Sequence, residues 1–352
     1  MKYNVLMIGP DITVKGGISS VVKGYQHSDY TSIVNMIYIS SHIDGSKLKK
    51  LFMAIKSVNV FMYNCIFNRP NIVHIHSSFG ASFYRKSIFV KLSNIFKIPI
   101  INHIHGAEFD NFYGQASDRK KKYIRKIYAL PTVNIALSHQ WKKNIDSMEL
   151  KNRIEIVENF ANRVNASGDI NKKNNILVLG EVSKRKGSYD IPLIAKEVIK
   201  ECKDVKFILG GNGDIESLKK IIKDNGLEEC IELKGWVDGV QKDKLLREAK
   251  IFFLPSYNEG MPMAILEAMA YGLPVITTNV GGIPTVIENN INGYVANPGD
   301  KFKFAKSILD LLKDNEKYMR ISQKNIKDLN DKYSVESHIN KIISIYASIV
   351  GE

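Results

Sequence analysis

PSYNEGMPMAILEAMAYGLPVITTNVGG, residues 255–282, joins two apolar, strand-like runs through a loop and a helix. The first run, IFFL, stands directly before it, and the second, PVITT, lies within it. Glycine and proline mark both helix ends, with Gly260 and Pro262 at the expected start and Gly272 and Pro274 at the expected end. The stretch therefore predicts a strand, a loop, a helix and a second strand in succession.

Two carboxylates in this stretch are candidate binding residues. Glu259 lies in the loop beside a glycine, and Glu267 lies in the helix among Ala, Met and Leu. Pro262 at the first helical position would leave the N–H groups of that turn aimed at the loop, where a phosphate is favoured. Either glutamate alone could be an ordinary solvated residue. Glu267, however, sits in a nearly all-apolar helix, and a buried carboxylate needs a partner.

Length and composition indicate a two-domain globular protein. The chain has 352 residues, 44% of them hydrophobic and 24% charged. There is no run of about 18 apolar residues, and the start MKYNVLMIGP is typical of a first strand rather than a signal peptide. Cys65, Cys202 and Cys230 are widely spaced, so we expect reduced thiols in a cytosolic protein.

The net charge of +14 is unevenly distributed. Residues 1–165 hold 23 Lys and Arg against 10 Asp and Glu, whereas the remainder holds 27 against 26. The basic first half indicates an anionic partner such as a membrane surface, a phosphate-bearing substrate or nucleic acid. Composition offers an equally weighted alternative, because the whole chain is rich in Lys, Asn and Ile and many lysines could simply be solvated.

Strand-like and helix-like segments alternate along both halves. The strand candidates are continuous apolar runs, which are typical of a parallel sheet covered on both faces. The pattern predicts an α/β protein with two doubly wound, Rossmann-like domains in tandem and a cleft between them. A polar segment at 163–175 is the expected linker, between a domain at 1–162 and a domain at 176–333. The expected strands are 4–9, 34–39, 71–76, 98–105, 133–137, 153–159, 175–180, 205–211, 230–235, 251–256, 274–278 and 293–297, and the expected helices are 18–25, 47–67, 82–96, 119–128, 191–200, 215–225, 241–249, 302–313 and 334–350.

Glycine-bearing loops follow several of these strands, where open α/β sheets bind ligands. PDITVKGGISS contains Gly16 and Gly17, which would let the backbone approach a ligand before a helix begins. LGEVSKRKG crowds three basic residues into one loop. LGGNGD fails as a dinucleotide fingerprint because Glu216 occupies the position of the third glycine. The sequence has no phosphate-loop motif, HExxH, CxxC pair or Asp-x-Asp, so we expect no metal site and no phosphate-loop ATPase.

Two histidine pairs end strands of the first half. His74 and His76 form one pair, and His103 and His105 form the other. Alternation along a strand places both members of a pair on one face of the sheet. A lone histidine at a strand end is usually structural, but two pairs at one edge favour a functional role.

Together these stretches resemble retaining glycosyltransferases of the GT-B fold, family 4 (glycosyl transferases group 1), of the bacterial surface-polysaccharide type. The matching motifs run in order along nearly the whole chain: KGGIS, HIHG, the KG of Lys186 and Gly187, GGNG, KGWV, EGMPMAILEAMAYGLPVITTNVGG and NGYVANPGD. The two glutamates of the sixth motif, with seven residues between them, are its specific part.

The resemblance implies roles for individual residues. The second domain would hold a nucleotide-diphosphate sugar, expected to be a UDP-sugar, with Glu267 on the ribose hydroxyls and Glu259 on the sugar hydroxyls. Lys186 would neutralise the diphosphate, and His105, or alternatively His103, would lie near the reacting sugar. The other donor-binding residues that it implies are Gly16, Gly17, Arg185, Asn258, Gly260, Met261 and Pro262. His76 and His103 are acceptor-side candidates.

One position departs from the family pattern. The family usually has arginine directly after the strand glycine of the second domain, and here that position is Glu181. Either Lys184 or Arg185 would then supply the missing positive charge from the same loop.

The function implied is metal-independent, cofactor-free retaining transfer of a hexose to a hydroxyl of a lipid-linked glycan. The final helix, 334–350, would return to the basic acceptor domain, which would face the inner side of the cytoplasmic membrane. Residues 46–67 and 119–126 are candidates for contact with anionic lipid, although ordinary surface helices would have similar patterns.

Three other classes of function compete with this interpretation. A non-catalytic sugar-nucleotide or polysaccharide binding protein remains the main alternative. Nucleic-acid binding is disfavoured because the lysines lack interleaved aromatic residues, and a nicotinamide dehydrogenase is disfavoured by the broken fingerprint.

Overall fold

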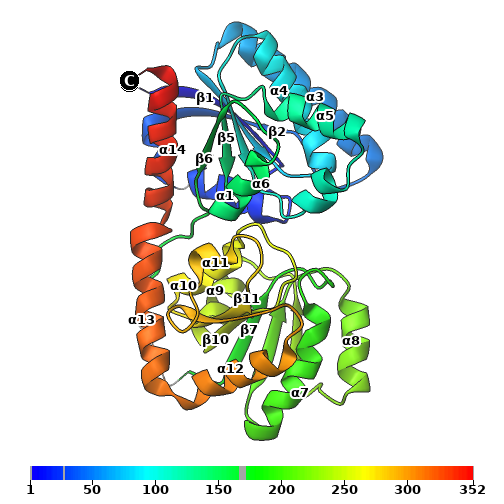
Figure 1. Ribbon diagram of the computed structural model, residues 1–352, viewed down its shortest axis with the longest axis vertical. Helices are drawn as coiled ribbons and strands as arrows, with labels where there is room; N and C mark the ends of the chain where they lie inside the picture. Colours follow the sequence, from blue (N-terminus) through cyan, green and yellow to red (C-terminus); the bar gives the residue numbers. More distant parts are fainter. Residues whose placement is uncertain (1, 27, 166–171, 352) are drawn as a thin grey trace. The chain divides into compact units, whose positions relative to one another are not determined.

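The structure, a computed structural model, describes residues 2–26, 28–165 and 172–351. The chain divides into two compact units, Met1–Phe160 with Val335–Glu352, and Ala161–Ser334. Each unit contains one six-stranded parallel sheet with helices on both faces (Figure 1). The prediction of two Rossmann-like α/β domains is therefore confirmed. Of the expected linker at 163–175, residues 166–171 lie outside the described residues.

The sheet of the first unit has the strand order β2-β1-β3-β4-β5-β6. Its strands are continuous apolar runs, and every residue of β3 is buried, as expected for a sheet that is covered on both sides. The strands are β1 (Tyr3–Gly9), β2 (Val34–Ser40), β3 (Ile72–Ser77), β4 (Ile100–Ile104), β5 (Val133–Ala136) and β6 (Arg153–Ile156). The helices are α1 (Gly17–Gln26), α2 (Tyr30–Ile33), α3 (Lys47–Phe67), α4 (Ala81–Ile95), the π-helical turn η1 (Asp110–Gly114), α5 (Asp118–Tyr128), α6 (His139–Asp146) and α14 (Val335–Val350).

The sheet of the second unit has the strand order β12-β11-β10-β7-β8-β9. Its central strands β7 and β10 are completely buried. The strands are β7 (Asn175–Leu179), β8 (Lys206–Gly210), β9 (Ile231–Gly235), β10 (Ile251–Leu254), β11 (Val275–Thr278) and β12 (Gly293–Ala296). The helices are the 3₁₀ turn η2 (Ser188–Asp190), α7 (Ile191–Glu201), α8 (Ile215–Asp224), α9 (Gly239–Glu248), α10 (Met263–Ala270), α11 (Ile283–Val286), α12 (Lys301–Lys313) and α13 (Asn315–Lys332).

The long helix α13 was not predicted from the sequence. Its buried face includes Ser322, Asn325 and Asp328, so the apolar period that marks an amphipathic helix is interrupted. Asn325 and Asp328 both bond the side chain of Asn292 at 3.0 Å. These polar contacts replace part of the usual hydrophobic packing.

The last helix, α14, packs within the first unit rather than the second. Its buried face is formed by Val335, His338, Ile339, Ile342, Ile345 and Tyr346. Val350, the last residue of α14, is 40% exposed. The hydroxyl of Tyr346 bonds Nδ1 of His74 at 2.6 Å, which fixes the face that α14 presents to the sheet.

Across the described ranges, no helix is both long enough and apolar enough to cross a bilayer.

Candidate active site

The loops with the strongest motifs follow the two strands at which the second sheet reverses its order. From β7 the chain winds outward through β8 and β9, and it then returns to β10 on the other side of β7. Ligands of open α/β sheets bind outside the carboxyl ends of strands at such a switch point. The loop 180–187 follows β7 and the loop 255–262 follows β10, so the fold brings these two motifs together.

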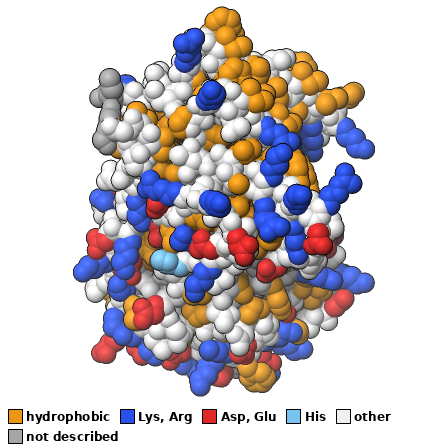
Figure 2. Space-filling model, turned by 45° about the horizontal axis from the view of Figure 1, so that its top comes forward, with side chains coloured by type: hydrophobic (Ala, Val, Ile, Leu, Met, Phe, Trp, Pro, Cys, Tyr) orange, Lys and Arg blue, Asp and Glu red, His pale blue; other side chains and the backbone are white. Residues whose placement is uncertain are grey.

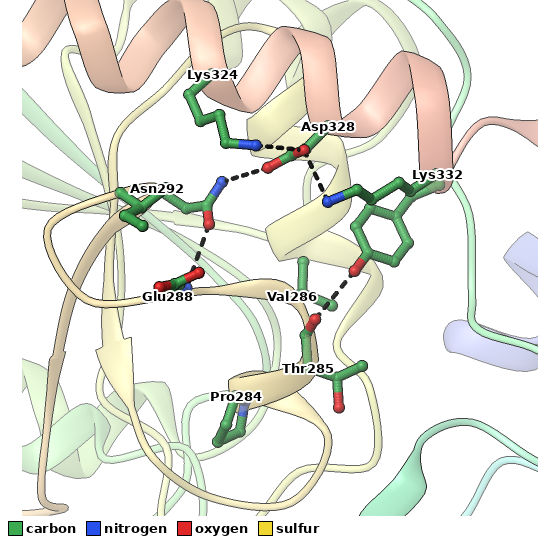
Figure 3. Close-up of a pocket in the computed structure, with 10 residues that line it drawn as sticks. Pro284, Thr285, Val286, Glu288, Asn292, Lys324, Asp328 and Lys332 are labelled. Carbon is green, nitrogen blue, oxygen red and sulfur yellow. Dashed lines mark hydrogen bonds and ion pairs between the residues drawn. The ribbon is translucent and has the colours of Figure 1, made fainter.

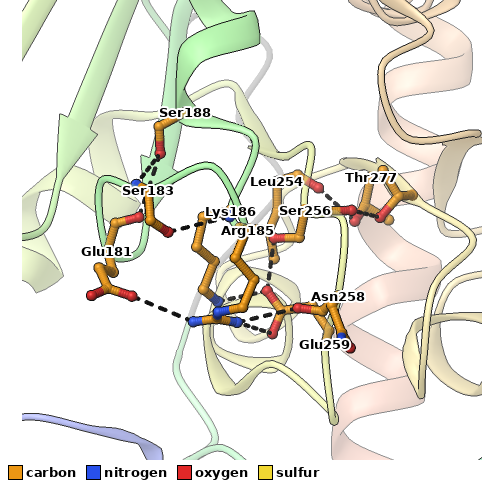
Figure 4. Close-up of polar contacts among 11 residues, drawn as sticks. Glu181, Ser183, Arg185, Lys186, Ser188, Leu254, Ser256, Asn258, Glu259 and Thr277 are labelled. Carbon is orange, nitrogen blue, oxygen red and sulfur yellow. Dashed lines mark hydrogen bonds and ion pairs between the residues drawn. The ribbon is translucent and has the colours of Figure 1, made fainter. Parts of the chain in front are cut away.

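Glu259 is held at the centre of this region by side chains from both loops (Figure 4). Its Oε1 accepts hydrogen bonds from Lys186 Nζ at 2.5 Å and from Ser256 Oγ at 2.7 Å. The side chains of Glu259 and Lys186 are only 6% and 16% exposed, so the charged groups neutralise each other in a largely dry environment. Oε2 lies 4.0 Å from Arg185 Nη1 and retains capacity to accept a hydrogen bond.

Arg185, rather than Lys184, supplies the positive charge beside Glu181. A guanidinium nitrogen of Arg185 lies 3.5 Å from the Glu181 carboxylate, and another donates to the Asn258 carbonyl at 3.2 Å. Lys184 is exposed. Arg185 thus stands between two carboxylates, and Glu181, left unplaced by the sequence, has a structural partner (Figure 4).

Two glycines allow the backbone to close around the Glu259 loop. A Cβ on Gly281, which has φ +56°, would lie 1.8 Å from the carbonyl oxygen of Glu259. A Cβ on Gly187, with φ +69°, would lie 2.1 Å from the carbonyl oxygen of Pro255. Both positions therefore require glycine for conformation and for space. The KG and NVGG motifs act at the level of the backbone, by fixing the position of Glu259.

The helix after the loop begins one residue later than predicted. Pro262 has extended backbone angles, φ −71° and ψ 119°, and it is the N-cap residue rather than the first helical residue of α10. The prediction was wrong by one position because proline fixes φ but not ψ. No side chain caps the N-terminus of α10, so its first turn stays directed toward the loop. Gly260, Met261 and Pro262 are all buried beneath this turn.

Glu267 has the partner that its apolar surroundings require. Lys242 on α9 donates to its Oε1 at 2.8 Å, and the Glu267 side chain remains 22% exposed. The carboxylate is therefore partly accessible, and it is paired even without a ligand.

Gly16 and Gly17 lie at the start of α1, after β1 of the first unit. Both are exposed, and a Cβ on Gly16 would meet no atom within 4 Å. Nothing within the first unit requires glycine at position 16. The first sheet reverses its order between β1 and β3, so this loop and the end of β3 lie at its switch point.

The two histidine pairs form one stacked column on the first sheet. His76 lies opposite His103 in the register of β3 and β4. Neighbouring rings stack with centroids 4.6 Å apart for His74 and His76, and 4.2 Å apart for His103 and His105. The placement of both pairs on one face, predicted from strand alternation, is confirmed.

The four histidine rings differ in how accessible they are to solvent. His74, His76 and His103 are 0% exposed, whereas His105 is partly exposed. Any contact of His76 or His103 with an acceptor would therefore be indirect. Burial lowers the pKa of His105 to about 3, so the ring is neutral at physiological pH.

A hydrogen bond of 2.9 Å joins His76 Nδ1 to His105 Nε2. In the described part of the chain, His76 Nε2 is buried without a hydrogen-bond partner. A proton on Nε2 would be a buried unsatisfied donor, which is rarer and costlier than a bare acceptor. We therefore assign the proton of His76 to Nδ1, which donates to His105 and leaves the proton of His105 on its outer nitrogen, Nδ1.

Three of these rings could also hold a metal ion by their chemistry. Ring nitrogens of His74, His76 and His103 lie within 4.8 Å of one another. Their rings stack, however, so their lone pairs do not converge on one point as metal ligands do.

A separate pocket of about 230 Å³ lies elsewhere in the second unit, between α13 and the segment 284–292 (Figure 3). Asp328 lies at its wall and pairs with Lys324 at 2.7 Å and Lys332 at 3.0 Å. The same carboxylate bonds Asn292, so this network attaches α13 to the loop before β12. The network accounts for the position of α13. The pocket contains none of the residues of the loops after β7 and β10.

Sequence reasoning missed two residues of the site, Ser256 and Lys242. Ser256 lies within the quoted stretch, three residues before its partner Glu259, and this spacing in a loop could have identified it. Lys242 is one of many surface lysines, and no local pattern distinguishes it.

The similarity of this chain to known proteins is not confined to the loops after β7 and β10. Residues 160–328 match the family described as glycosyl transferases group 1. An uncharacterized 41.2 kDa protein in the cps region of Klebsiella pneumoniae is 26% identical, over 96% of this chain and 98% of that protein. The UDP-Gal:alpha-D-GlcNAc-diphosphoundecaprenol alpha-1,3-galactosyltransferase of Escherichia coli is 26% identical, over 80% of this chain and 76% of that protein.

Among solved structures, HepE of Anabaena in complex with UDP superimposes with a TM-score of 0.77 at 15% identity, over 99% of this chain and 100% of that one. At this identity the similarity establishes the fold alone. The family match over residues 160–328, the glycosyltransferase relatives and the two parallel sheets together support a glycosyltransferase of the GT-B fold.

Proposed function

We propose that this protein is a retaining family 4 glycosyltransferase that moves a hexose from a UDP-sugar to a hydroxyl of a lipid-linked glycan in surface-polysaccharide biosynthesis. The observation that carries the proposal is the Glu259 site, where a buried carboxylate is held by Lys186 and Ser256 beside Arg185. The E. coli relative is named for a UDP-sugar donor and a diphosphoundecaprenol acceptor. We extend these two chemical classes, but not the sugars, to this chain.

The donor diphosphate would bind where positive charge and N–H groups meet. Lys186 and Arg185 provide two cations in one loop, and the uncapped N-terminus of α10 provides backbone donors. As the bond between the sugar and the diphosphate breaks, negative charge grows on the leaving oxygen, and these groups would stabilise it without a metal ion.

The sugar and ribose would be recognised by the two glutamates. Oε2 of Glu259 has capacity to accept from sugar hydroxyls while Oε1 stays bound to Lys186 and Ser256. Glu267, whose side chain is 22% exposed, would accept from the ribose hydroxyls while its Oε1 stays bound to Lys242. From the first unit, Gly16 and Gly17 would approach the phosphates, and His105 would donate from Nδ1 to the reacting sugar.

Retention requires the acceptor hydroxyl to attack the face that the diphosphate leaves. The new bond joins the acceptor oxygen to the anomeric carbon, and the hydroxyl proton passes to the departing phosphate oxygen. In this reaction neither glutamate forms a covalent bond to the sugar. The reaction would take place at the cytoplasmic face of the membrane, where a lipid-linked acceptor is reached.

The test is UDP release from a panel of UDP-sugars, with and without lipid-linked acceptors. Wild type should release UDP, whereas Lys186→Ala and Glu267→Ala should lose at least about a hundredfold in rate while remaining folded. Lys244→Ala is the matched control, because Lys244 lies on α9 close to Lys242 but is 72% exposed. Donor binding without UDP release would instead indicate a non-catalytic binding protein. Normal turnover in both site variants would contradict the site.

A further inference from the structure

The helix α3 exposes most of its large apolar residues, whereas an ordinary surface helix buries them. Its buried residues are Ser57, Phe61, Asn64 and Cys65. Its exposed hydrophobic residues include Leu48, Phe52 and Phe67, at 79%, 69% and 68%. Such exposure of large side chains carries a free-energy cost in water, so it indicates a surface with a partner.

These exposed residues form one stripe rather than a scatter. Leu48, Leu51, Phe52, Ile55, Tyr63 and Ile66 recur at helical spacing along one side of α3. The neighbouring helix α4, which packs against α3, exposes Tyr84, Ile88 and Ile95. We call these nine residues the α3–α4 surface. In Figure 2 hydrophobic side chains are exposed together with lysine and arginine side chains.

The charge around this surface is of one sign. Lys47, Lys49 and Lys56 flank the stripe on α3, Lys50 lies in the same first turn of the helix, and all four are exposed. The sequence contains no Asp or Glu between Asp44 and Glu108. The helices α3 and α4 therefore combine exposed apolar residues with lysines and carry no acidic residue of their own.

Helix α5, which carries RKKKYIRK at 119–126, provides an internal comparison. Its apolar residues Ile124, Ile127 and Tyr128 are buried, and its basic residues point outward. It is an ordinary amphipathic helix with a solvated basic face. Of the two lipid-contact candidates from the sequence, the one on α3 exposes a row of large apolar side chains that the described residues leave uncovered, whereas the one on α5 buries its apolar residues.

We propose that the α3–α4 surface docks onto an anionic phospholipid bilayer, with the apolar stripe at the level of the acyl chains and the lysines on the headgroup phosphates. A helix with this combination of residues lies in the plane of a membrane interface. A second copy of the chain is disfavoured as occupant, because a symmetric contact would place lysines against lysines with no acid between them. Nucleic acid is disfavoured because six of the nine residues of the surface are Leu or Ile, which provide no stacking platform for bases.

This inference deepens the proposed function by specifying how the enzyme would reach a lipid-linked acceptor, and its test does not measure transfer. Full-length protein is floated with vesicles of two parts phosphatidylcholine to one part phosphatidylglycerol, and with vesicles of phosphatidylcholine alone. Wild type should bind the anionic vesicles, more weakly at high salt and much more weakly when phosphatidylglycerol is absent.

Two variants and one control separate the contributions. Leu48→Ser with Phe52→Ser should weaken vesicle binding at least about tenfold, because both side chains are apolar and mostly exposed. Replacing the four α3 lysines by glutamine should weaken binding roughly fivefold for each lysine removed. Val240→Ser with Phe302→Ser removes two equally exposed apolar residues, 87% and 81%, from the second unit and should leave binding unchanged.

The proposal is overturned if wild type fails to bind anionic vesicles, or if Leu48→Ser with Phe52→Ser binds as wild type does. It is also overturned if this variant abolishes a dimer in size-exclusion chromatography instead of vesicle binding. Release of UDP with a water-soluble acceptor should be equal in wild type and variant, so loss of docking and failure of the proposed activity give different results.

Discussion

Acid should destabilise the first unit well before the second. All eight histidines of the sequence lie at positions 27–139 or at 338, in the first unit. Burial lowers the pKa of His74 and His105 to about 3 and that of His338 to about 4, from an ordinary value of 6.5. Below about pH 6.5 these histidines therefore bind protons in the unfolded chain but stay unprotonated in the folded unit. The stability of the unit is complete above that pH and falls as the pH approaches 4.

The size of the effect follows from proton linkage. At pH 5.5 each of the three residues should lower the free energy of unfolding by between about 1 and 2 kcal/mol, or about 4 kcal/mol in total. At pH 4.5 the loss should approach 8 kcal/mol, comparable with the whole stability of a typical domain. Burial also lowers the pKa of His76 and His103, which acts in the same direction.

The two tryptophans allow each unit to be followed separately. Trp141 lies on α6 of the first unit and is buried, and Trp236 follows β9 in the second unit. In Trp236→Phe, urea unfolding followed by the fluorescence of Trp141 should show the loss between pH 7.5 and 5.5. In Trp141→Phe, the fluorescence of Trp236 should show a much smaller change. Equal pH dependence of the two units, or none in the first, would refute the reasoning.

Three further predictions concern the second unit. Lys186→Ala should lower the free energy of unfolding of this unit by about 2 kcal/mol and its Tm by about 4–8 °C, because Glu259 loses its main ion-pair partner. Calorimetry measures the change. Adding Glu259→Gln should restore part of the lost stability, and a further decrease in the double variant would contradict the ion-pair explanation. In urea unfolding, Gly281→Ala should destabilise the unit by at least about 2 kcal/mol more than Gly226→Ala. Both glycines have positive φ, but a Cβ at Gly281 would meet the backbone of Glu259, whereas a Cβ at Gly226 would meet no atom within 4 Å. Equal destabilisation would show that the contact between Gly281 and the Glu259 loop is not required. Asp328→Asn should lower the free energy of unfolding of the unit by about 2 kcal/mol, because Asp328 pairs with two lysines and bonds Asn292. Asp331→Asn, at an exposed position of the same helix, is the control and should leave stability unchanged. Unchanged stability in Asp328→Asn would show that the network does not anchor α13.

The fold was readable from the sequence because its strands are continuous apolar runs bounded by glycine and proline. The helix 47–67 was predicted with the bounds that the structure gives it. The same pattern could not show which side of that helix is buried, because the large apolar residues are mostly exposed and the buried face includes Ser57 and Asn64. Helix α13 escaped prediction for a related reason, since Ser322, Asn325 and Asp328 occupy core positions.

At the candidate site, the motifs predict Glu259, Lys186 and Glu267 as site residues, but they do not predict the contacts that these residues make. The pairing of Lys186 with Glu259 spans 73 residues, and that of Lys242 with Glu267 spans 25. Such pairs depend on which strands become neighbours in the sheet. The residues around each partner do not indicate this strand order. The sequence likewise did not indicate that, of Lys184 and Arg185, it is Arg185 whose side chain lies against Glu181 and Glu259.

The placement of α14 has a consequence for the order in which the protein matures on the ribosome. The first unit is interrupted after Phe160 and resumes at Val335, so its sheet is synthesised before the second unit and α14 after it. Until α14 arrives, His74 lacks the Tyr346 hydroxyl, and Tyr25 lacks His338. The inserted second unit can fold as soon as it is made, whereas the amino-terminal unit, although translated first, is completed last. A nascent chain released before residue 335 would carry one finished unit and one with an open core.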